Sequence, residues 1–242
     1  MKKMKKMLLL IAGCCFAANL FGAGEPFAAW NFDQVQDQII SPAVGKWSLK
    51  LLNPANVKHI DGKNGKAVAF LGADKERGTV GGAYVSGFSF DCTQPFTIEV
   101  VFKLNADSGY RNFKEIICFS DGERGPGLRV TVFYDKIVMG SGDGKASYSV
   151  ATDASKTAIT KDKWHFLTLT YDGKTASIYW DGVLAASKEM AITKGKYNAL
   201  FLGSLRNAYA YALQGAIDEL KFYNYAKTAA ETAEAFLAFS EE

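Results

Sequence analysis

The chain has 242 residues, of which 48% are hydrophobic and 13% aromatic, and its formal net charge is +3 at pH 7. This length suits one globular domain whose core is large enough to be stable without disulfides or metals. The small positive charge comes from the first residues of the chain, so it gives no support for nucleic-acid binding.

The first segment has the pattern of a secretory leader. Residues 1–7 form a basic n-region, the apolar stretch 8–20 is too short for a membrane span, and small residues follow over 22–24. We therefore expect a bacterial-type signal peptide over residues 1–23 and one domain over residues 24–242, secreted or located in the cell envelope. Four lysines lie in the n-region, which leaves 24 basic and 25 acidic residues in the remaining chain.

The leader has a second interpretation, which stays open. Ile11-Ala12-Gly13-Cys14 resembles the lipobox of bacterial lipoproteins, in which Cys14 is lipidated and becomes the new N-terminus. Both routes export the chain, and a lipid at Cys14 is the only contact with a membrane that we expect.

The rest of the chain has the pattern of an all-β protein. Short alternating segments are separated by Gly, Asp, Asn and Pro clusters, and no linker or low-complexity stretch divides them. This spacing predicts an antiparallel sandwich rather than βαβ units. The predicted strands are 27–32, 46–52, 67–71, 82–90, 96–104, 113–120, 127–134, 137–141, 147–151, 164–171, 175–180, 183–188, 199–203 and 215–223.

Two cysteines remain after the leader, Cys92 and Cys118. An exported chain with two cysteines is compatible with a disulfide. If strands 96–104 and 113–120 form a hairpin, however, Cys118 lies about six residues along the sheet from Cys92, at roughly 3.3 Å per residue, which is too far for a bond. We expect two separate thiols and keep the disulfide as the alternative.

Two Asp-Gly steps, at 172–173 and 181–182, predict two tight turns that join three strands into a meander. With two-residue loops at these steps, apolar residues face apolar residues and hydroxyls face hydroxyls. The expected pairs on the core side are Tyr171 with Lys174, Leu169 with Ala176, Leu167 with Ile178, Trp180 with Val183 and Ile178 with Ala185, and Tyr179 faces Leu184 on the other side.

The meander also places an apolar stripe on its outer face and a histidine on its core face. We expect His165 to be a buried structural residue. The stripe of Phe166, Tyr179 and Leu184 is either covered by another segment, such as a C-terminal helix, or exposed as a platform for a sugar or a protein.

One helix is predicted, near the C-terminus. Thr228 and Glu231 fit a capping box, and an Ala-rich run follows them. Phe236, Leu237 and Phe239 would pack this helix back on the sandwich.

The segments "KWHFLTLTYDGKTASIYWDGVLAAS" (163–187) and "ALFLGSLRNAYAYALQGAIDELKFYNYAKTAAE" (199–231) resemble the concanavalin A-like lectin/glucanase superfamily, in particular its laminin G-like domains. The shared features are the Tyr-Asp-Gly and Asp-Gly turns and the final Gly-x-Ile-Asp-Glu strand. The resemblance extends over about 27–239 and implies an antiparallel two-sheet jelly-roll β-sandwich with about six or seven strands in each sheet. It also implies binding of a polysaccharide or glycan, or of an extracellular protein.

Related jelly rolls hold a structural calcium ion between the first and last strands. The resemblance implies Asp33 and Asp218 as metal ligands here, with a backbone carbonyl near Gly65. The alternative is that Asp218 and Glu219 are only hydrogen-bonding or surface residues of the last strand.

The superfamily also contains glucanases, which use two carboxylates, often in a Glu-x-Asp-x-x-Glu run. That run is absent, and only Glu99 and Glu115 could meet, if their strands were neighbours in a suitable register. We therefore expect no catalytic residues and no enzyme activity, and keep a glycoside hydrolase as the least favoured alternative.

Two loops carry the residue types of a sugar site, aromatic platforms beside polar groups. The candidates are Arg206, Asn207, Tyr209 and Tyr211 in one loop, and Tyr110 and Arg111 in another. The sequence thus predicts a secreted, non-catalytic, lectin-like module; the alternatives are solvated turns with packing tyrosines, and an adhesion or scaffold protein that binds a protein partner.

Overall fold

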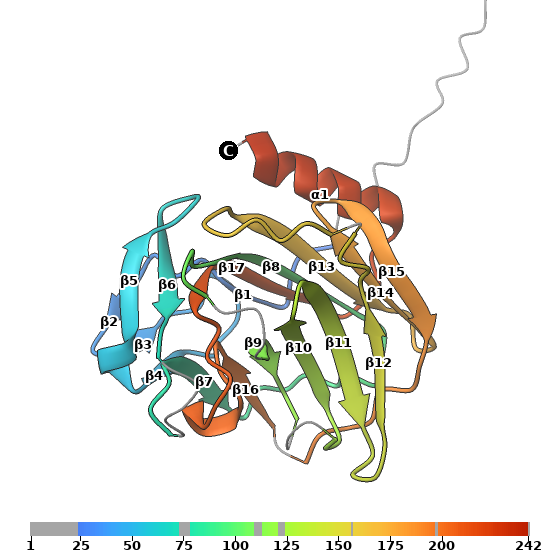
Figure 1. The fold of residues 1–242 in the computed structure, drawn as a ribbon, viewed down its shortest axis with the longest axis horizontal. Helices are drawn as coiled ribbons and strands as arrows, with labels where there is room; N and C mark the ends of the chain where they lie inside the picture. The colour runs from blue at the N-terminus through green and yellow to red at the C-terminus, as the bar shows by residue number, and fades with distance from the viewer. Residues whose placement is uncertain are drawn as a thin grey trace, which may run out of the picture.

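The computed structural model describes residues 24–72, 78–108, 113–120, 124–155, 157–196 and 198–241. Over these ranges the chain forms two antiparallel β-sheets and a C-terminal helix (Figure 1). This confirms the predicted two-sheet jelly-roll sandwich. No helix in these ranges is long and apolar enough to span a membrane.

The first sheet, called sheet A, has eight strands: β1 (Ala28–Trp30), β5 (Val57–Asp61), β6 (Lys66–Phe70), β8 (Phe96–Leu104), β13 (His165–Tyr171), β14 (Thr175–Trp180), β15 (Val183–Glu189) and β17 (Gly215–Tyr223). Seven of them follow the order β15-β14-β13-β8-β17-β6-β5, and β1 pairs with β17. The central strands β8 and β13 are buried along most of their length because both of their faces are covered.

The second sheet, called sheet B, has nine strands: β2 (Val35–Gln36), β3 (Ile39–Ile40), β4 (Leu49–Leu52), β7 (Gly82–Ser86), β9 (Lys114–Cys118), β10 (Leu128–Phe133), β11 (Lys136–Gly142), β12 (Ser147–Ala151) and β16 (Ala199–Leu202). Their order is β12-β11-β10-β9-β16-β7-β4-β3-β2. Two 3₁₀ turns, η1 (Pro54–Asn56) and η2 (Arg206–Ala208), lie in the connections.

The core fills the space between the two sheets with alternate side chains of their strands. At one end it is mainly aromatic: the Phe88 ring lies 5.1 Å from Phe222 and 5.7 Å from Trp30, centroid to centroid. Trp30 and Phe222 are fully buried. Such tilted and edge-to-face pairs favour one arrangement of the sheets beyond simple apolar burial.

The first turn of the meander differs from the prediction in register but not in side-chain faces. Leu167 pairs with Trp180 and Leu169 with Ile178, a shift of two residues from the predicted pairs. Asp172 pairs with Thr175, so the loop is Gly173-Lys174; the Asp172 carboxylate accepts the N–H groups of Lys174 (2.8 Å) and Thr175 (2.7 Å). Gly173 has a φ of 98°, as a II′-type turn requires of its first central residue. A shift of two keeps the alternation, so the core face is unchanged.

The second turn is the predicted two-residue loop. Asp181 and Gly182 both have positive φ, 46° and 78°, which is the I′ pattern. Trp180 pairs with Val183 and Tyr179 with Leu184, as predicted. Ile178 pairs with Ala186 instead of Ala185 because a β-bulge follows it.

Asp181 does more than form this turn. Its carboxylate accepts the backbone N–H of Phe166 at 2.9 Å and lies 3.0 Å from Nδ1 of His165. The His165 ring is buried and stacks on Trp180 with centroids 4.4 Å apart. The structural role predicted for His165 is confirmed.

The hairpin predicted between residues 96–104 and 113–120 does not form. β8 lies in sheet A between β13 and β17, whereas β9 lies in sheet B between β10 and β16. The chain crosses from one sheet to the other between these strands. Both strands are buried on both faces, so the sequence pattern carries no signal of which sheet each one joins.

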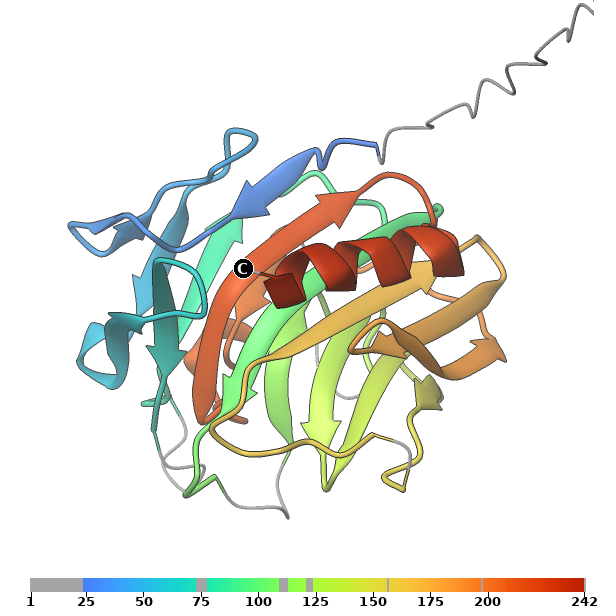
Figure 2. The same cartoon turned by 90° about the horizontal axis from the view of Figure 1, so that it is seen from above.

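The predicted C-terminal helix is α1 (Ala229–Glu241), and it lies across the outer face of sheet A (Figure 2). Its capping box is formed: Glu231 Oε2 accepts the Thr228 N–H at 2.7 Å, and Thr228 Oγ1 accepts the Glu231 N–H at 3.3 Å. Phe239 packs on Phe166 with centroids 5.4 Å apart. The helix thus covers the part of the apolar stripe around Phe166, while Leu184 stays half exposed.

Both cysteines are free and buried, which confirms two separate thiols, although the hairpin used to argue for them is absent. Burial raises the pKa of the Cys92 thiol to about 11 and that of Cys118 to about 12. Neither side chain is therefore a ready nucleophile.

Candidate functional site

A pocket of about 400 Å³ lies on the outer face of sheet B, over β9 to β12, which run side by side in Figure 1. Alternation along β10 builds it: Leu128, Val130 and Val132 point into the core, whereas Arg129 and Thr131 line the pocket. Strand order therefore gathers polar and aromatic side chains of β10, β11 and β12 on one surface, together with Phe113 and Ser120 beyond the two ends of β9.

The floor of the pocket is fixed by a buried ion pair. Arg129 Nε donates to Glu115 Oε1 at 3.0 Å and Nη2 donates to Oε2 at 2.6 Å, so the contact is bidentate. The exposed fractions of the two side chains are 9% for Arg129 and 0% for Glu115. A buried pair of this geometry holds both groups in place, and removal of one partner leaves an uncompensated charge.

One end of the pocket is aromatic. Phe113 and Phe133 stack with centroids 4.1 Å apart and planes 11° apart. Tyr211 adds a third ring, 5.3 Å from Phe113, and the Arg129 guanidinium lies 5.8 Å from the Tyr211 centroid. This cluster offers the apolar surface on which a ligand ring can stack.

The other end is formed by the hairpin of β11 and β12. The Tyr148 ring lines the pocket and is 38% exposed, and its hydroxyl donates to Asp143 Oδ2 at 3.0 Å. The backbone N–H groups of Ala146 and Lys145, together with this hydroxyl, lower the pKa of Asp143. The hydroxyls of Ser147 and Ser149 on β12 also line the pocket.

The structure places three of the predicted sugar-binding residues, Tyr211, Tyr209 and Arg206, in different surroundings. Tyr211 lies beside the pocket, as described above. Tyr209 is 46% exposed and follows η2, where its carbonyl accepts the Gly78 N–H. Arg206 is half-buried within η2. Of the predicted residues of this loop whose side chains the structure describes, only Tyr211 lies beside the pocket.

The other predicted residues cannot be placed in this way. Tyr110 and Arg111 lie outside the described residues, as does the side chain of Asn207. Cys14 and the rest of the expected leader also lie outside them. These assignments stay predictions.

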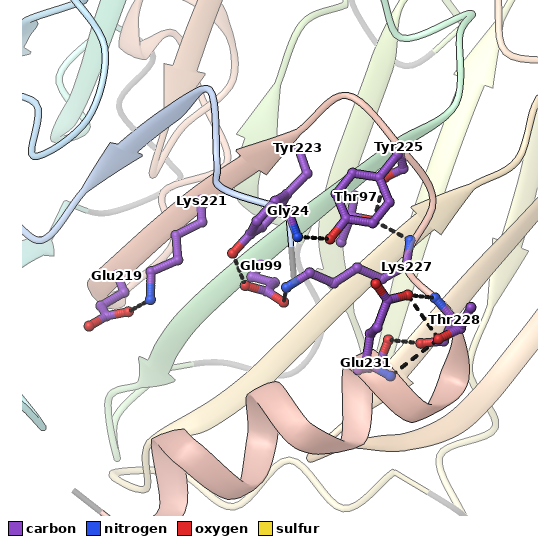
Figure 3. Close-up of polar contacts among 11 residues, drawn as sticks. Gly24, Thr97, Glu99, Glu219, Lys221, Tyr223, Tyr225, Lys227, Thr228 and Glu231 are labelled. Atoms are coloured by element: carbon purple, nitrogen blue, oxygen red, sulfur yellow. Dashed lines mark hydrogen bonds and ion pairs between the residues drawn. The ribbon is translucent and has the colours of Figure 1, made fainter. Parts of the chain in front are cut away.

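The two carboxylates considered for hydrolysis do not meet. Glu99 projects from sheet A toward α1, whereas Glu115 projects from the outer face of sheet B. Glu99 accepts Lys227 Nζ at 2.5 Å and the Tyr223 hydroxyl at 2.9 Å, beneath the start of α1 (Figure 3). Burial, with Glu99 next to it, raises the pKa of Tyr223. Glu99 is thus fully engaged in fixing the helix, and the Glu99–Glu115 alternative is wrong.

The residues predicted to hold calcium both contact the turn between β5 and β6. Asp33 accepts the Lys66 N–H at 2.8 Å, and Asp218 Oδ2 accepts the N–H groups of Lys63 (2.5 Å) and Asn64 (3.1 Å). Asp218 is buried, and its Oδ1 has no hydrogen-bond partner. No cluster of three or more His, Cys, Asp or Glu side chains suited to a metal occurs in the described parts of the chain.

The orphaned oxygen is the feature of this site that fits a cation. A buried carboxylate oxygen without a donor is costly unless a positive charge or a proton satisfies it. Burial raises the pKa of Asp218 to about 6, and the charges of Glu219 and Asp33 add to the effect. Carboxylate oxygens are the hard ligands that Ca²⁺ prefers, and Asp33 and Asp218 bring two such groups to the same turn.

The pocket residues were missed in the sequence because their signal is structural. Residues 128–133, "LRVTVF", show the alternation of a half-buried strand, which places Arg129, Thr131 and Phe133 on one face. Nothing local indicates that this face is an open pocket rather than a covered surface. That follows only from the strand order of sheet B.

The fold is shared with large bacterial toxin domains. Similar structures include the binding domain of Paraclostridial Mosquitocidal Protein 1 (TM-score 0.64, 17% identity, 88% of this chain and 52% of that chain). The binding domain of Botulinum Neurotoxin DC is similar in its complex with SialylT (TM-score 0.66, 13% identity, 88% and 50%) and in its complex with rat synaptotagmin II (TM-score 0.67, 13% identity, 89% and 52%). The chain spans about half the length of these structures.

The sequence itself connects the chain to a family. A search of curated proteins finds no match. A family model described as the concanavalin A-like lectin/glucanases superfamily (Laminin_G_3) matches residues 77–233, which is more than half of the chain and includes both turns of the meander and β17. The chain therefore belongs to the concanavalin A-like lectin/glucanase superfamily.

Proposed function

We propose that the protein is an exported, non-catalytic module that binds carbohydrate in the pocket over β9 to β12. The observation that carries this proposal is the composition of the pocket. An aromatic end at Phe133, an aromatic wall at Tyr148 and hydroxyl groups between them are what a sugar ring needs for stacking and hydrogen bonding.

The superfamily and the fold alone do not decide the ligand. The superfamily name covers lectins and glucanases, and the similar structures include one complex with SialylT and one with rat synaptotagmin II. The engagement of Glu99 by Lys227 and Tyr223 favours a binding role over hydrolysis, because that carboxylate has no access to a substrate. The expected leader over residues 1–23 supports export to the cell envelope or beyond it.

A glycan screen with the exported form of the chain tests the proposal. We expect Phe133→Ala and Tyr148→Ala each to weaken binding of a sugar hit by about tenfold or more, because each removes a stacking surface. Tyr148→Ala is the safer variant because Tyr148 lies on an exposed hairpin. Circular dichroism checks that both variants fold.

Tyr209→Ala is the matched control, because Tyr209 is a predicted sugar ligand that does not line the pocket. Loss of binding in this control alone would show that the sugar binds at the loop after β16 and not in the pocket. Binding of no glycan at all, with capture of a cell-envelope protein, would replace the proposal with the adhesion alternative. Polysaccharide hydrolysis by the protein would overturn the non-catalytic assignment.

We also propose that Ca²⁺ binds at the turn between β5 and β6, with the carboxylates of Asp33 and Asp218 as ligands. The partnerless Oδ1 of Asp218 supports this site. The ion would fasten the turn to the first and last strands and so stabilise the fold.

A further inference from the structure

The pocket carries a positive charge. Three cationic side chains, Arg124, Arg129 and Lys136, are among its lining residues, and none of the described lining residues is acidic. Glu115 neutralises Arg129 from below. Within the described chain, neither Arg124 nor Lys136 forms a salt bridge, and both are exposed.

The acidic residue that contacts the wall of the pocket is already engaged. Asp143 accepts the Lys145 N–H (2.8 Å), the Ala146 N–H (2.8 Å) and the Tyr148 hydroxyl (3.0 Å). These three bonds use its oxygens to hold the tip of the β11–β12 hairpin. The Arg124 carbonyl accepts the Gly144 N–H at 2.8 Å, so the backbone of Arg124 is fixed to the same hairpin.

We propose that the ligand of this pocket is an acidic saccharide, one that carries a carboxylate or sulfate group; this inference rests on the proposed carbohydrate-binding function. The sugar ring stacks at the aromatic end, where Lys136 pairs with an anionic group, while Arg124 at the hairpin end of the pocket pairs with a second anionic group of the same saccharide. An arginine fork matches a carboxylate or a sulfate in two parallel hydrogen bonds, and lysine adds a point charge. A volume of about 400 Å³ falls within the size range of small-ligand sites.

The experiment compares two matched pairs of polysaccharides by isothermal titration calorimetry. Polygalacturonate and its fully methyl-esterified form differ in that each carboxylate is replaced by a neutral methyl ester, and dextran sulfate and dextran differ only in the sulfate. We expect the charged member of at least one pair to bind and its neutral partner to bind at least about tenfold more weakly. The pair that responds identifies which anionic group is recognised.

Two variants assign the effect to the pocket. Lys136→Gln and Arg124→Gln are each expected to lower affinity for the charged polymer about five- to tenfold, because each removes one charge-assisted contact. Lys145→Gln is the matched control: Lys145 lies in the same hairpin, is exposed and does not line the pocket. Its affinity is expected to stay within about twofold, in line with the small effect of peripheral charges.

The possible outcomes distinguish a failure of the acidic-ligand inference from a failure of the proposed carbohydrate-binding function. Equal binding of charged and neutral polymers, lost in Tyr148→Ala and unchanged in Lys136→Gln, would overturn the acidic ligand and leave the carbohydrate site standing. Binding of neither member of any pair, together with an empty glycan screen, would overturn both. Equal binding of duplex DNA, or a Lys145→Gln effect as large as that of Lys136→Gln, would show a general attraction for polyanions and overturn the inference.

Discussion

At the scale of single residues, Asp218 has the most unusual environment among the described carboxylates. It is buried, its Oδ1 lacks a partner, and its pKa is raised from 3.8 to about 6. Because the folded state binds this proton more tightly than the unfolded state, protonation of Asp218 stabilises the fold at low pH. That stabilisation is lost as the pH rises through about 6.

Replacing Asp218 with Asn should therefore reduce the loss of stability between about pH 4 and pH 6 in the presence of EDTA. We expect Asp218→Asn to be at least as stable as the wild type at pH 7 with chelator, because no charge is then buried. Added Ca²⁺ should raise the melting temperature of the wild type but not that of the variant, because the variant lacks one ligand. Urea unfolding across this pH range, repeated with calcium, measures both effects.

Asp61→Asn provides the control from the same hairpin. The Asp61 side chain is 90% exposed and pairs with Lys66, which lowers its pKa, so its neutralisation should not reproduce the effect of Asp218→Asn. A wild-type melting temperature that is unchanged by both calcium and EDTA would contradict the proposed calcium site. An Asp218→Asn variant with the wild-type pH dependence would show that another group causes it.

At the scale of elements, the sequence predicts side-chain faces better than strand partners. The strands of the meander have the expected core face even though the first turn uses Gly173-Lys174, because a shift of two residues preserves alternation. The Asp172 carboxylate decides this turn by binding the N–H of Lys174 and of Thr175. Such a preference depends on hydrogen-bond geometry that residue pairing alone does not reveal.

Strand partners depend on information that no short segment contains. β8 and β9 are both buried along most of their length, and they belong to different sheets because β8 pairs with β13 and β17 whereas β9 pairs with β10 and β16. The pocket could not be predicted from the sequence for the same reason, since its lining residues belong to strands that become neighbours only through the strand order of sheet B. The sequence could place Arg129 and Phe133 on one face of a strand, but not beside Phe113 and Tyr148.

Apolar packing and one buried ion pair together fix the position of the helix α1. The side chains of Glu99 and Lys227 are 5% and 3% exposed, and the ammonium also lies 3.9 Å from the centroid of the Tyr223 ring. We expect Lys227→Met to lower the free energy of unfolding by about 3–5 kcal/mol, because it leaves the Glu99 carboxylate buried without its counter-ion. The double variant Glu99→Gln/Lys227→Met should recover part of this loss. Urea unfolding of the two single variants and the double variant measures the coupling.

The neighbouring pair Lys221–Glu219 is a matched control (Figure 3). Its atoms are equally close, at 2.6 Å, but its side chains are 37% and 22% exposed. Lys221→Met should cost about 1 kcal/mol or less because water screens the pair. Equal losses in Lys227→Met and Lys221→Met, or strictly additive single variants, would contradict a buried clamp.

At the scale of the whole molecule, the sandwich is held by its core rather than by covalent links. Two sheets bury a continuous apolar layer between them, and α1 covers part of the outside of sheet A. Cys92 contacts this layer, and Cys118 lies in β9 between β10 and β16. Both thiols are free, so nothing in the described fold should respond to reductant.

Thiol labelling should therefore report the opening of the sandwich. With Ellman's reagent at pH 8, we expect the native protein to react at least about a thousandfold more slowly than the protein in urea, because both thiols are buried and their pKa values are raised. Cys92→Ser and Cys118→Ser variants separate the two rates. Cys118 should be the slower thiol, since it lies on a strand paired on both sides, whereas Cys92 lies in the connection between β7 and β8. Rapid labelling of the native protein, or an unfolding midpoint that drops on adding reductant, would show that the core does not hold the two sheets together by itself.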